Sequence, residues 1–281
     1  MRIQTISDIN RAEISGLLRT TGLQKELQMP SLRLFVPVLL AAALCGAPQV
    51  ASAQAFSDTQ RTDIESIIKS YLLAHPEVLE DAMNELSKRQ TAAEEKKHQE
   101  AIAKNAEEIF NSPRGVVLGN KDGDVTFVEF FDYNCGYCKR AMADMLDLLK
   151  NDTKLKVVLK EFPVLSDGSV EAAKVAVAVR MQDPKKYLDF HTKLLGGRGP
   201  ADKARAMAAA KEAGLDTAKI EKDLATPEVK ATIEENLKLA EDMGLNGTPS
   251  YVIGKQIVIG AVGLDGLKEK IGIARCGKAE C

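Results

Sequence analysis

The polar and apolar positions between Phe56 and Phe110 follow a helical period. Apolar side chains recur three and four residues apart, as in an amphipathic helix; they are Ile64, Ile67, Ile68, Tyr71, Leu72, Val78, Leu79, Ala82, Met83 and Leu86. Pro76 interrupts the pattern and suits the first turn of a second helix. Residues 87–108 are mostly Ala, Glu, Lys and Gln, which predicts a solvated helix or connector. Two helices cannot bury such a stripe alone, so we expect this segment to pack on the main domain or to associate with other copies.

The pattern changes to a strand, a helix and a second strand after a turn-rich boundary at residues 111–124. Val125 to Tyr133 is β-branched and aromatic, and its nearly continuous apolar character predicts a buried central strand. A helical pattern covers Cys138 to Lys150, and Leu155 to Leu165 reads as the next strand. Parallel pairing through a right-handed crossover is the default for such a unit.

Residues 169–244 are almost wholly helical in pattern and are punctuated by Gly, Pro and Asp. Two short strand patterns then flank Gly254-Lys255 as a hairpin, and a closing helix follows at Gly263 to Ala274. We therefore predict an α/β fold with an inserted all-helical subdomain at about residues 166–244. It belongs to a domain of residues 111–281, preceded by an N-terminal helical extension at residues 56–110.

The segment from Met29 to Ala55 has the layout of a secretory signal peptide. Arg33 precedes an uncharged apolar core, Leu34 to Leu44, and small residues ending "ASAQA" follow. That core is too short to span a bilayer, which needs about 20 residues. We expect cleavage after Ala55 or Ala53 and a periplasmic location. Residues 1–28 are unusual for a leader, so we interpret Met29 as the true start and residues 1–55 as signal peptide with a doubtful extension.

Composition excludes several partners. The formal charge is −2, Trp is absent and aromatic residues make up 5%. These values give no reason to expect nucleic acid or an anionic membrane surface as a partner. His75, His98 and His191 are scattered singly, which favours surface or core positions over metal ligation.

Cys135 and Cys138 form a CxxC pair at the predicted junction of strand and helix. In an oxidising compartment thiols become disulfides unless they are kept reduced, which favours a redox or structural role. The helix N-terminus stabilises a thiolate at Cys135, and Lys139 and Arg140 add a smaller effect. Cys135 is therefore the candidate nucleophile and Cys138 the resolving thiol. We expect no cofactor.

Three other uses of the cysteines stay open. A zinc site needs four ligands, but the second pair, Cys276 and Cys281, lies far downstream after the last predicted helix. A purely structural disulfide at Cys135–Cys138 would constrain the unfolded chain little, because the loop is small. The soft thiolates could instead bind Cu(I). Cys276 and Cys281 are expected to form a local disulfide or to remain spare thiols.

Two further features point to the same chemistry. Thr248-Pro249 stands just before a strand, where a trans proline is awkward, so we predict a cis bond in a loop that faces the dithiol; the alternative is an ordinary turn proline. Glu129 is an acid inside an apolar strand, and buried carboxylates usually have a partner or a task. It could relay protons for Cys138, with Lys160 as a charge partner, or lie on an exposed edge.

"VEFFDYNCGYC", the helical insertion and "GTPSYVIG" together resemble the DsbA-like thioredoxin superfamily of exported disulfide oxidoreductases over Val116 to Ala274. The resemblance implies a thioredoxin fold, with Cys135 as nucleophile, Cys138 as resolving cysteine, Glu129 as buried acid and Thr248-Pro249 as the cis-proline loop. "YLLAHPEVLEDAMNELSKRQ" resembles the N-terminal segment of ScsC-type copper-sensitivity suppressors, some of which are trimers. This implies a homo-oligomer through Phe56 to Leu86.

The sequence departs from the oxidase pattern at three positions. Gly136-Tyr137 stands where DsbA-type oxidases usually carry Pro-His, and Thr248 where they carry Val; both resemble the DsbC-type isomerases, whose dimerisation domain is missing here. The absent His removes one source of thiolate stabilisation, which indicates a weaker oxidant. We therefore expect a disulfide isomerase or reductase acting on cysteine-containing exported proteins and served by a membrane redox partner. A DsbA-like oxidase and a Cu(I)-binding protein are the alternatives.

Overall fold

The computed structural model describes residues 56–281, so the predicted leader and its cleavage site lie outside the described residues. Ten α-helices, one short 3-10 helix and five strands follow one another within this range. In chain order they are α1 Asp58–Ala74, α2 Glu77–Lys104, α3 Ala106–Phe110, β1 Val116–Gly119, β2 Val125–Phe131, α4 Gly136–Asn151, β3 Leu155–Glu161, α5 Asp167–Gln182, η1 Pro184–Lys186, α6 Tyr187–Gly196, α7 Lys203–Glu212, α8 Thr217–Asp223, α9 Pro227–Asp242, β4 Ser250–Ile253, β5 Gln256–Ile259 and α10 Gly263–Cys276. The order matches the predicted α/β fold with a helical insertion.

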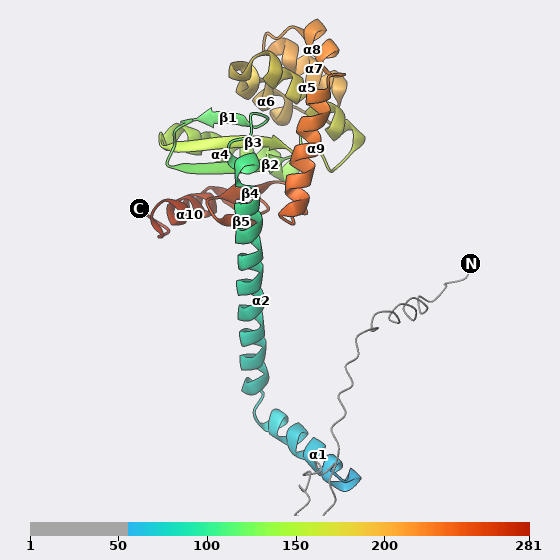
Figure 1. Ribbon diagram of the computed structural model, residues 1–281, viewed down its shortest axis with the longest axis vertical. Coiled ribbons are helices and arrows are strands. Elements are labelled where there is room, and N and C mark those ends of the chain that lie inside the picture. Colours follow the sequence, from blue (N-terminus) through green and yellow to red (C-terminus); the bar gives the residue numbers. More distant parts are fainter. Residues whose placement is uncertain (1–55) are drawn as a thin grey trace, which may run out of the picture. The chain divides into compact units, whose positions relative to one another are not determined.

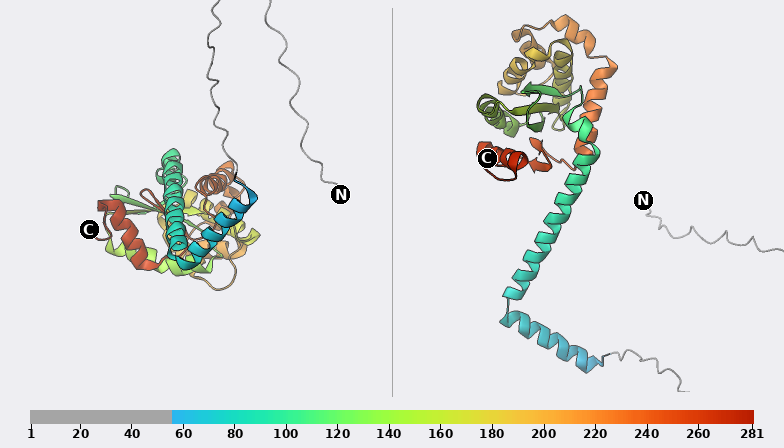
Figure 2. Two further views of the ribbon diagram at one scale, coloured as in Figure 1. Left: turned by 90° about the horizontal axis from the view of Figure 1, so that it is seen from below. Right: turned by 60° about the vertical axis from the view of Figure 1, so that its left-hand side comes forward.

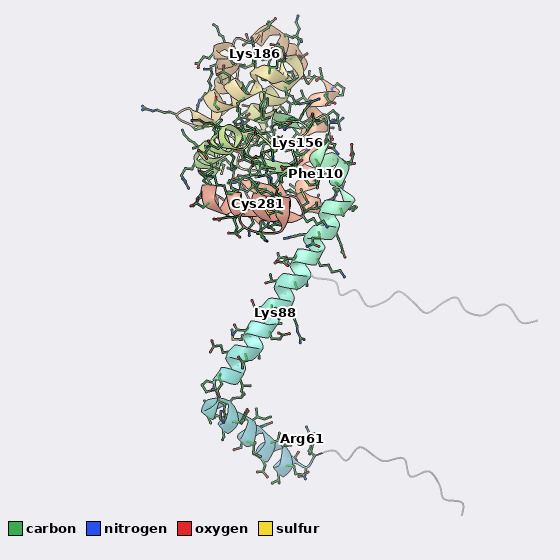
Figure 3. All side chains as sticks on the ribbon, turned by 90° about the vertical axis from the view of Figure 1, so that its left-hand side faces the viewer. Arg61, Lys88, Phe110, Lys156, Lys186 and Cys281 are labelled. Carbon is green, nitrogen blue, oxygen red and sulfur yellow. A yellow bond between two sulfur atoms is a disulfide. The ribbon has the colours of Figure 1, made fainter. Side chains whose placement is uncertain are left out.

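Helices α1 and α2 expose their apolar residues. Pro76 caps the N-terminus of α2, as its position in the sequence predicts. Helix α1 has no buried residue, and in α2 only Ile102 is buried, near the end that contacts β5. Figure 3 shows the side chains of α2 around Lys88 projecting away from the helix without a covering element among the described residues. The apolar stripe therefore has no covering element within residues 56–281.

The sheet has five strands in the order β1-β3-β2-β4-β5. Strands β2 and β3 are parallel and joined through α4, as predicted, whereas β1, β4 and β5 each join antiparallel. The sequence did not predict β1, because its four residues lie among turn residues. Lys156 of β3 donates from Nζ to the carbonyl of Phe110, which ties the end of α3 to the sheet (Figure 3).

The two faces of β2 pack into different cores. Phe127 and Phe131 face the core that α4 and α10 cover, whereas Val128 and Phe130 face α3 and α9. Because side chains alternate along a strand, Glu129 lies on the same face as Phe127 and Phe131. The strand therefore directs this acid toward α4, the helix that carries the cysteines.

The insertion α5–α9 leaves the sheet after β3 and returns to it at β4. Its helices gather in a group of their own, and α9 brings the chain back beside the sheet (Figures 1 and 2). Small and β-branched residues of α5 make it the central helix of this group, buried against α7, α8 and α9. The Ser166 hydroxyl begins α5 by accepting from the Ser169 N–H at 3.1 Å.

The chain closes with α10 and a disulfide between Cys276 and Cys281. This pairing confirms the predicted local bridge and removes both sulfurs from any shared site with Cys135. Within residues 56–281 no helix is long and apolar enough to cross a membrane.

Candidate dithiol active site

Cys135 and Cys138 lie at the N-terminus of α4, directly after the turn that follows β2. Cys135 is the N-cap residue, and its Sγ accepts from the backbone N–H of Cys138 at 3.3 Å. The Cys135 thiol also donates to the carbonyl oxygen of Thr248 at 3.1 Å. Both cysteines are free thiols; Cys135 is 6% exposed and Cys138 0%. The pair is thus in its reduced form, and Cys135 is the more exposed of the two residues.

Asp132 and Asn134 hold the turn before the cysteines. The Asp132 carboxylate accepts from the backbone N–H groups of Asn134, Val164 and Leu165 at 2.8–3.0 Å. Asn134 exchanges two hydrogen bonds with the backbone of Ala201, at 2.6 and 2.8 Å, and so ties the turn to the insertion. Sequence reasoning missed both roles; the polar letters in "FDYNC", between an apolar strand and a helix, were the available signal.

Burial separates the two sulfurs chemically. The pKa of the Cys138 thiol is raised well above its ordinary value, chiefly because burial penalises the thiolate and further by the nearby Glu129 carboxyl. Cys138 therefore needs a base before it can attack a disulfide. Its position, one turn below Cys135 on α4, suits it for attack from inside the protein.

Glu129 supplies a titratable group beneath the dithiol. It is 3% exposed, and burial followed by the charge of Asp144 raises its pKa to about 8. Its cross-strand neighbours are Leu159 on β3 and Tyr251 on β4. The prediction of a buried acid is therefore confirmed, and the alternative of an exposed edge is wrong, since Glu129 is buried in a central strand.

Lys160 is not the charge partner of Glu129. It pairs in register with Phe130, so its side chain lies on the opposite face of the sheet. There its Nζ is 3.7 Å from Glu235 of α9, and burial lowers its pKa. The predicted pairing is wrong because the strand register, which the sequence pattern does not show, decides which side chains of neighbouring strands share a face.

The Thr248–Pro249 loop faces the dithiol, and its peptide bond is cis, as expected. The Thr248 carbonyl contacts Cys135, while the Pro249 carbonyl accepts from the Gly260 N–H at 2.8 Å and anchors the loop to the end of β5. This arrangement leaves backbone next to Cys135, where an extended peptide could lie.

The two residues between the cysteines face outward. A side chain added at Gly136 would meet no atom within 4 Å. Tyr137 is 60% exposed, and the Arg140 guanidinium lies 4.3 Å above its ring. Both spacer residues therefore lie on the exposed side of the dithiol.

A second buried acid lies on the same face of the sheet at the end of β3. Glu161 accepts from the Tyr187 hydroxyl at 2.5 Å, and Tyr187 contacts the Tyr133 hydroxyl at 3.2 Å. His191 lies beside them, and burial lowers its pKa to about 3, so it is neutral. This confirms the expectation of a core histidine.

Metal ligands do not gather at the site. Among the described residues, no group of three or more His, Cys, Asp or Glu side chains could hold a metal ion. The residues predicted from the sequence that the fold does bring together are Cys135, Cys138, Glu129, Thr248 and Pro249.

Two family models match the chain. The DSBA-like thioredoxin domain covers residues 126–272, and the copper resistance protein ScsC N-terminal domain covers residues 60–93. A thioredoxin-like oxidoreductase from Silicibacter pomeroyi is 44% identical, with 60% of this chain and 96% of that chain covered and a TM-score of 0.58. Proteus mirabilis ScsC in a transitional conformation is 29% identical, with 79% and 97% covered and a TM-score of 0.59.

The curated relatives include a disulfide bond formation protein and Na(+)/H(+) antiporters. Disulfide bond formation protein D of Bacillus subtilis is 26% identical over 167 residues, which is 55% of this chain and 74% of the relative. The chain also matches the Na(+)/H(+) antiporter NhaA 1 of Salinispora arenicola at 24% identity over 164 residues. This match covers 58% of the chain but only about a quarter of the antiporter's length.

Proposed function

The chain belongs to the family of DSBA-like thioredoxin domains, and we propose that within it the protein is a periplasmic disulfide isomerase or reductase. The observation that carries this proposal is the pair itself: a Cys135 thiol at a helix N-terminus, within 3.1 Å of the Thr248 carbonyl, above a buried Cys138. Its substrates would be cysteine-containing exported proteins.

The exchange begins at Cys135. Its thiolate attacks one sulfur of a substrate disulfide, forming a mixed disulfide and releasing the other substrate sulfur as a thiolate. Two exits follow. If a substrate thiolate attacks the mixed disulfide at the substrate's own sulfur, a new substrate disulfide forms and Cys135 leaves unchanged, which is isomerisation. If Cys138 attacks Cys135, a Cys135–Cys138 disulfide forms, the substrate leaves reduced, and two electrons have passed to it.

Features of the site favour isomerisation or reduction over oxidation. A strong oxidant stabilises its thiolate, and a histidine imidazolium next to the sulfur is one way to do so. The exposed Gly136-Tyr137 spacer places no such cation beside the Cys135 sulfur. Thr248, rather than an aliphatic residue, precedes the cis proline. An isomerase must also be re-reduced, so we propose a membrane redox partner. The similarity to a periplasmic thioredoxin-like protein from Salmonella enterica, 29% identical, supports the location.

Association through α1 and α2 belongs to the same proposal. Large apolar side chains along both helices are exposed, including Ile67, Tyr71, Leu79 and Met83. An apolar stripe of this length favours burial against identical copies. A homo-oligomer through Phe56 to Leu86, a trimer being one such assembly, would place several dithiols around one substrate. The match of residues 60–93 to an ScsC N-terminal domain supports it.

The alternative functions use the same sulfurs. A dithiol oxidase agrees with the similarity to the Bacillus disulfide bond formation protein and to the thiol-disulfide exchange protein alpha-DsbA2 from Wolbachia pipientis, 30% identical. Cu(I) binding agrees with the name of the N-terminal family and with the softness of two adjacent thiolates.

Refolding of scrambled ribonuclease tests the proposal. The mature protein should restore ribonuclease activity, and the Cys135→Ser variant should not; equal activity of the two would refute the exchange chemistry. A reduction potential measured against glutathione separates the functions, because an isomerase lies near −180 mV and a strong oxidase near −120 mV, both approximate values. Titration of the reduced protein with Cu(I) gives the third outcome: tight stoichiometric binding would favour a copper protein.

A further inference from the structure

Tyr251 carries a buried polar group that the exchange chemistry leaves unused. It lies on β4 in register with Glu129 of β2, two residues after the cis proline. Its side chain is buried, and its hydroxyl has no hydrogen-bond partner among residues 56–281. Buried tyrosine hydroxyls ordinarily find a partner, so an unpaired one beside a dithiol calls for an explanation.

The cross-strand neighbours of Glu129 make Tyr251 the donor within reach. Directly opposite residues in an antiparallel pair have Cβ atoms about 5 Å apart and interact. The neighbour on the other side, Leu159 of β3, offers no polar side-chain atom. Lys160 points to the opposite face. Tyr251 is therefore the cross-strand residue that can donate a hydrogen bond to this carboxyl.

The other charged groups around Glu129 are acidic. Helix α4 contributes Cys138 and Asp144, and Asp265 of α10 acts in turn on Asp144. Glu161 stands diagonally across on β3, but its carboxyl is held by Tyr187. These groups oppose ionisation of Glu129, as burial does.

The electrostatics of Tyr251 agree with this placement. Burial raises the pKa of its phenol well above the ordinary value, and the charges of Glu129, Cys138 and Asp144 raise it further. The phenol therefore keeps its proton throughout the working pH range. It can act as a hydrogen-bond donor but not as a base.

We propose that Tyr251 is a positioning residue for the resolving step, donating a hydrogen bond to the Glu129 carboxylate so that this group can accept the proton of Cys138. This inference rests on the exchange chemistry proposed above. In the reduced protein a neutral Glu129 does not require the bond. The bond forms when Glu129 ionises, in line with catalytic hydrogen bonds that tighten along a reaction.

The resolving step moves one proton and exchanges one disulfide bond for another. The Cys138 thiol gives its proton to the Glu129 carboxylate, and the resulting thiolate attacks Sγ of Cys135 in the mixed disulfide. The Cys135–Cys138 bond forms, and the bond from Cys135 to the substrate sulfur breaks. The substrate sulfur leaves as a thiolate that carries the electron pair, and Glu129 then returns its proton to water.

The hydrogen bond sets how much of Glu129 is ionised at neutral pH. Burial and the charge of Asp144, without the hydrogen bond, place the pKa of Glu129 at about 8, where roughly a tenth of it is ionised at pH 7. A hydrogen bond to the charged form favours that form, so the Tyr251 donor lowers the pKa below this value and removing the donor returns it to about 8. A shift of about one unit changes the ionised fraction at pH 7 from about a half to about a tenth.

Stopped-flow reaction of the reduced mature chain with 5,5′-dithiobis(2-nitrobenzoate) separates the two sulfurs. The first release of thionitrobenzoate reports attack by Cys135, and the second reports attack by Cys138 on the mixed disulfide. Rates of both releases are recorded from about pH 6 to about pH 9 for wild type and variants. The matched control is Tyr187→Phe, which removes a buried phenol hydroxyl from the same face of the sheet, away from Glu129.

For Tyr251→Phe we expect the first release to stay within about twofold of wild type. The second should slow about fivefold at pH 7, with a pH midpoint about one unit higher. Tyr187→Phe should leave this midpoint unchanged. Glu129→Gln should remove the pH step, and adding Tyr251→Phe to it should slow the reaction no further, because the hydroxyl acts through the carboxylate.

Three results would overturn the inference in distinguishable ways. Wild-type and Tyr251→Phe chains with the same second-release profile would refute the role of Tyr251 alone. A wild-type chain that gives no second release would refute the resolving chemistry and, with it, both this inference and the reductase exit of the proposed function. A slowed second release in Glu129→Gln/Tyr251→Phe relative to Glu129→Gln would show that the hydroxyl acts independently of Glu129.

Discussion

The helices α1 and α2 and the dithiol site depart from ordinary protein architecture in opposite directions. The helices leave large apolar side chains such as Met83 in water, while the dithiol site buries the polar groups of Glu129 and Tyr251. Each arrangement raises the free energy of the isolated chain, the first by exposing apolar surface and the second by removing polar groups from water. On the proposals above, contact with another copy would relieve the first, and the resolving reaction would be the reason that the second is retained.

The two regions also differ in what they require of their side chains. An apolar stripe requires contact area, so conservative changes should be tolerated there and charges should not. The dithiol site requires particular atoms, so single-atom changes such as Glu to Gln or Tyr to Phe should have clear effects. Substitutions that disrupt one region and leave the other intact test this difference in requirements.

The largest expected effect comes from placing charge in the apolar stripe. Leu79→Glu combined with Met83→Glu should convert the proposed oligomer completely to monomer, since neighbouring carboxylates on one helix face would have to be buried in each copy. Sedimentation velocity measures the mass. The first release of thionitrobenzoate should be unchanged, whereas refolding of scrambled ribonuclease should fall.

Asn84→Glu provides the control for that experiment. It adds a carboxylate to the same exposed stretch of α2 but removes no apolar side chain. The control should keep the wild-type mass. An unchanged mass for Leu79→Glu/Met83→Glu would show that the stripe does not hold the copies together.

The next effect is a pH dependence of stability caused by Glu129. Its folded-state pKa of about 8 lies above its ordinary value of 4.5, so the folded chain keeps a proton that the unfolded chain releases. Stability is therefore lost as pH rises from about 4.5 to 8, with a slope of at most about 1.4 kcal/mol per unit. Glu129→Gln should lose less stability than wild type over this range in urea unfolding. Parallel pH dependences would mean that Glu129 is ionised in the fold.

The sequence predicted features that depend on local pattern. The CxxC pair, the helical insertion and the hairpin at Gly254-Lys255 all follow from spacing within short windows. What failed depends on pairing between distant segments. The β2–β4 register decides which β4 residue lies opposite Glu129, and the β2–β3 register decides which face of the sheet Lys160 occupies. Neither register can be inferred from a short stretch of sequence. Asn134 reaches Ala201 through the fold of the insertion.

A smaller loss of stability should follow Tyr187→Phe. The Tyr187 hydroxyl donates to Glu161 at 2.5 Å, and the other Glu161 oxygen has no partner among the described residues. Removing the donor leaves a buried carboxyl unsatisfied, which costs about 1–3 kcal/mol. Urea unfolding at pH 6 should show this loss. A variant as stable as wild type would indicate that the interior of the protein readjusts to satisfy Glu161.

Tyr251→Phe should instead increase the free energy of unfolding, and this is the smallest of the expected effects. Its hydroxyl is buried without a partner among residues 56–281, so Tyr251→Phe removes an uncompensated polar group. We expect a gain of up to about 1 kcal/mol in the free energy of unfolding, measured beside Tyr187→Phe under identical conditions. A chain that becomes more stable while its resolving step slows would show a hydroxyl kept for chemistry at the expense of stability. A loss of stability comparable to that of Tyr187→Phe would instead mean that the Tyr251 hydroxyl is already hydrogen-bonded in the resting protein.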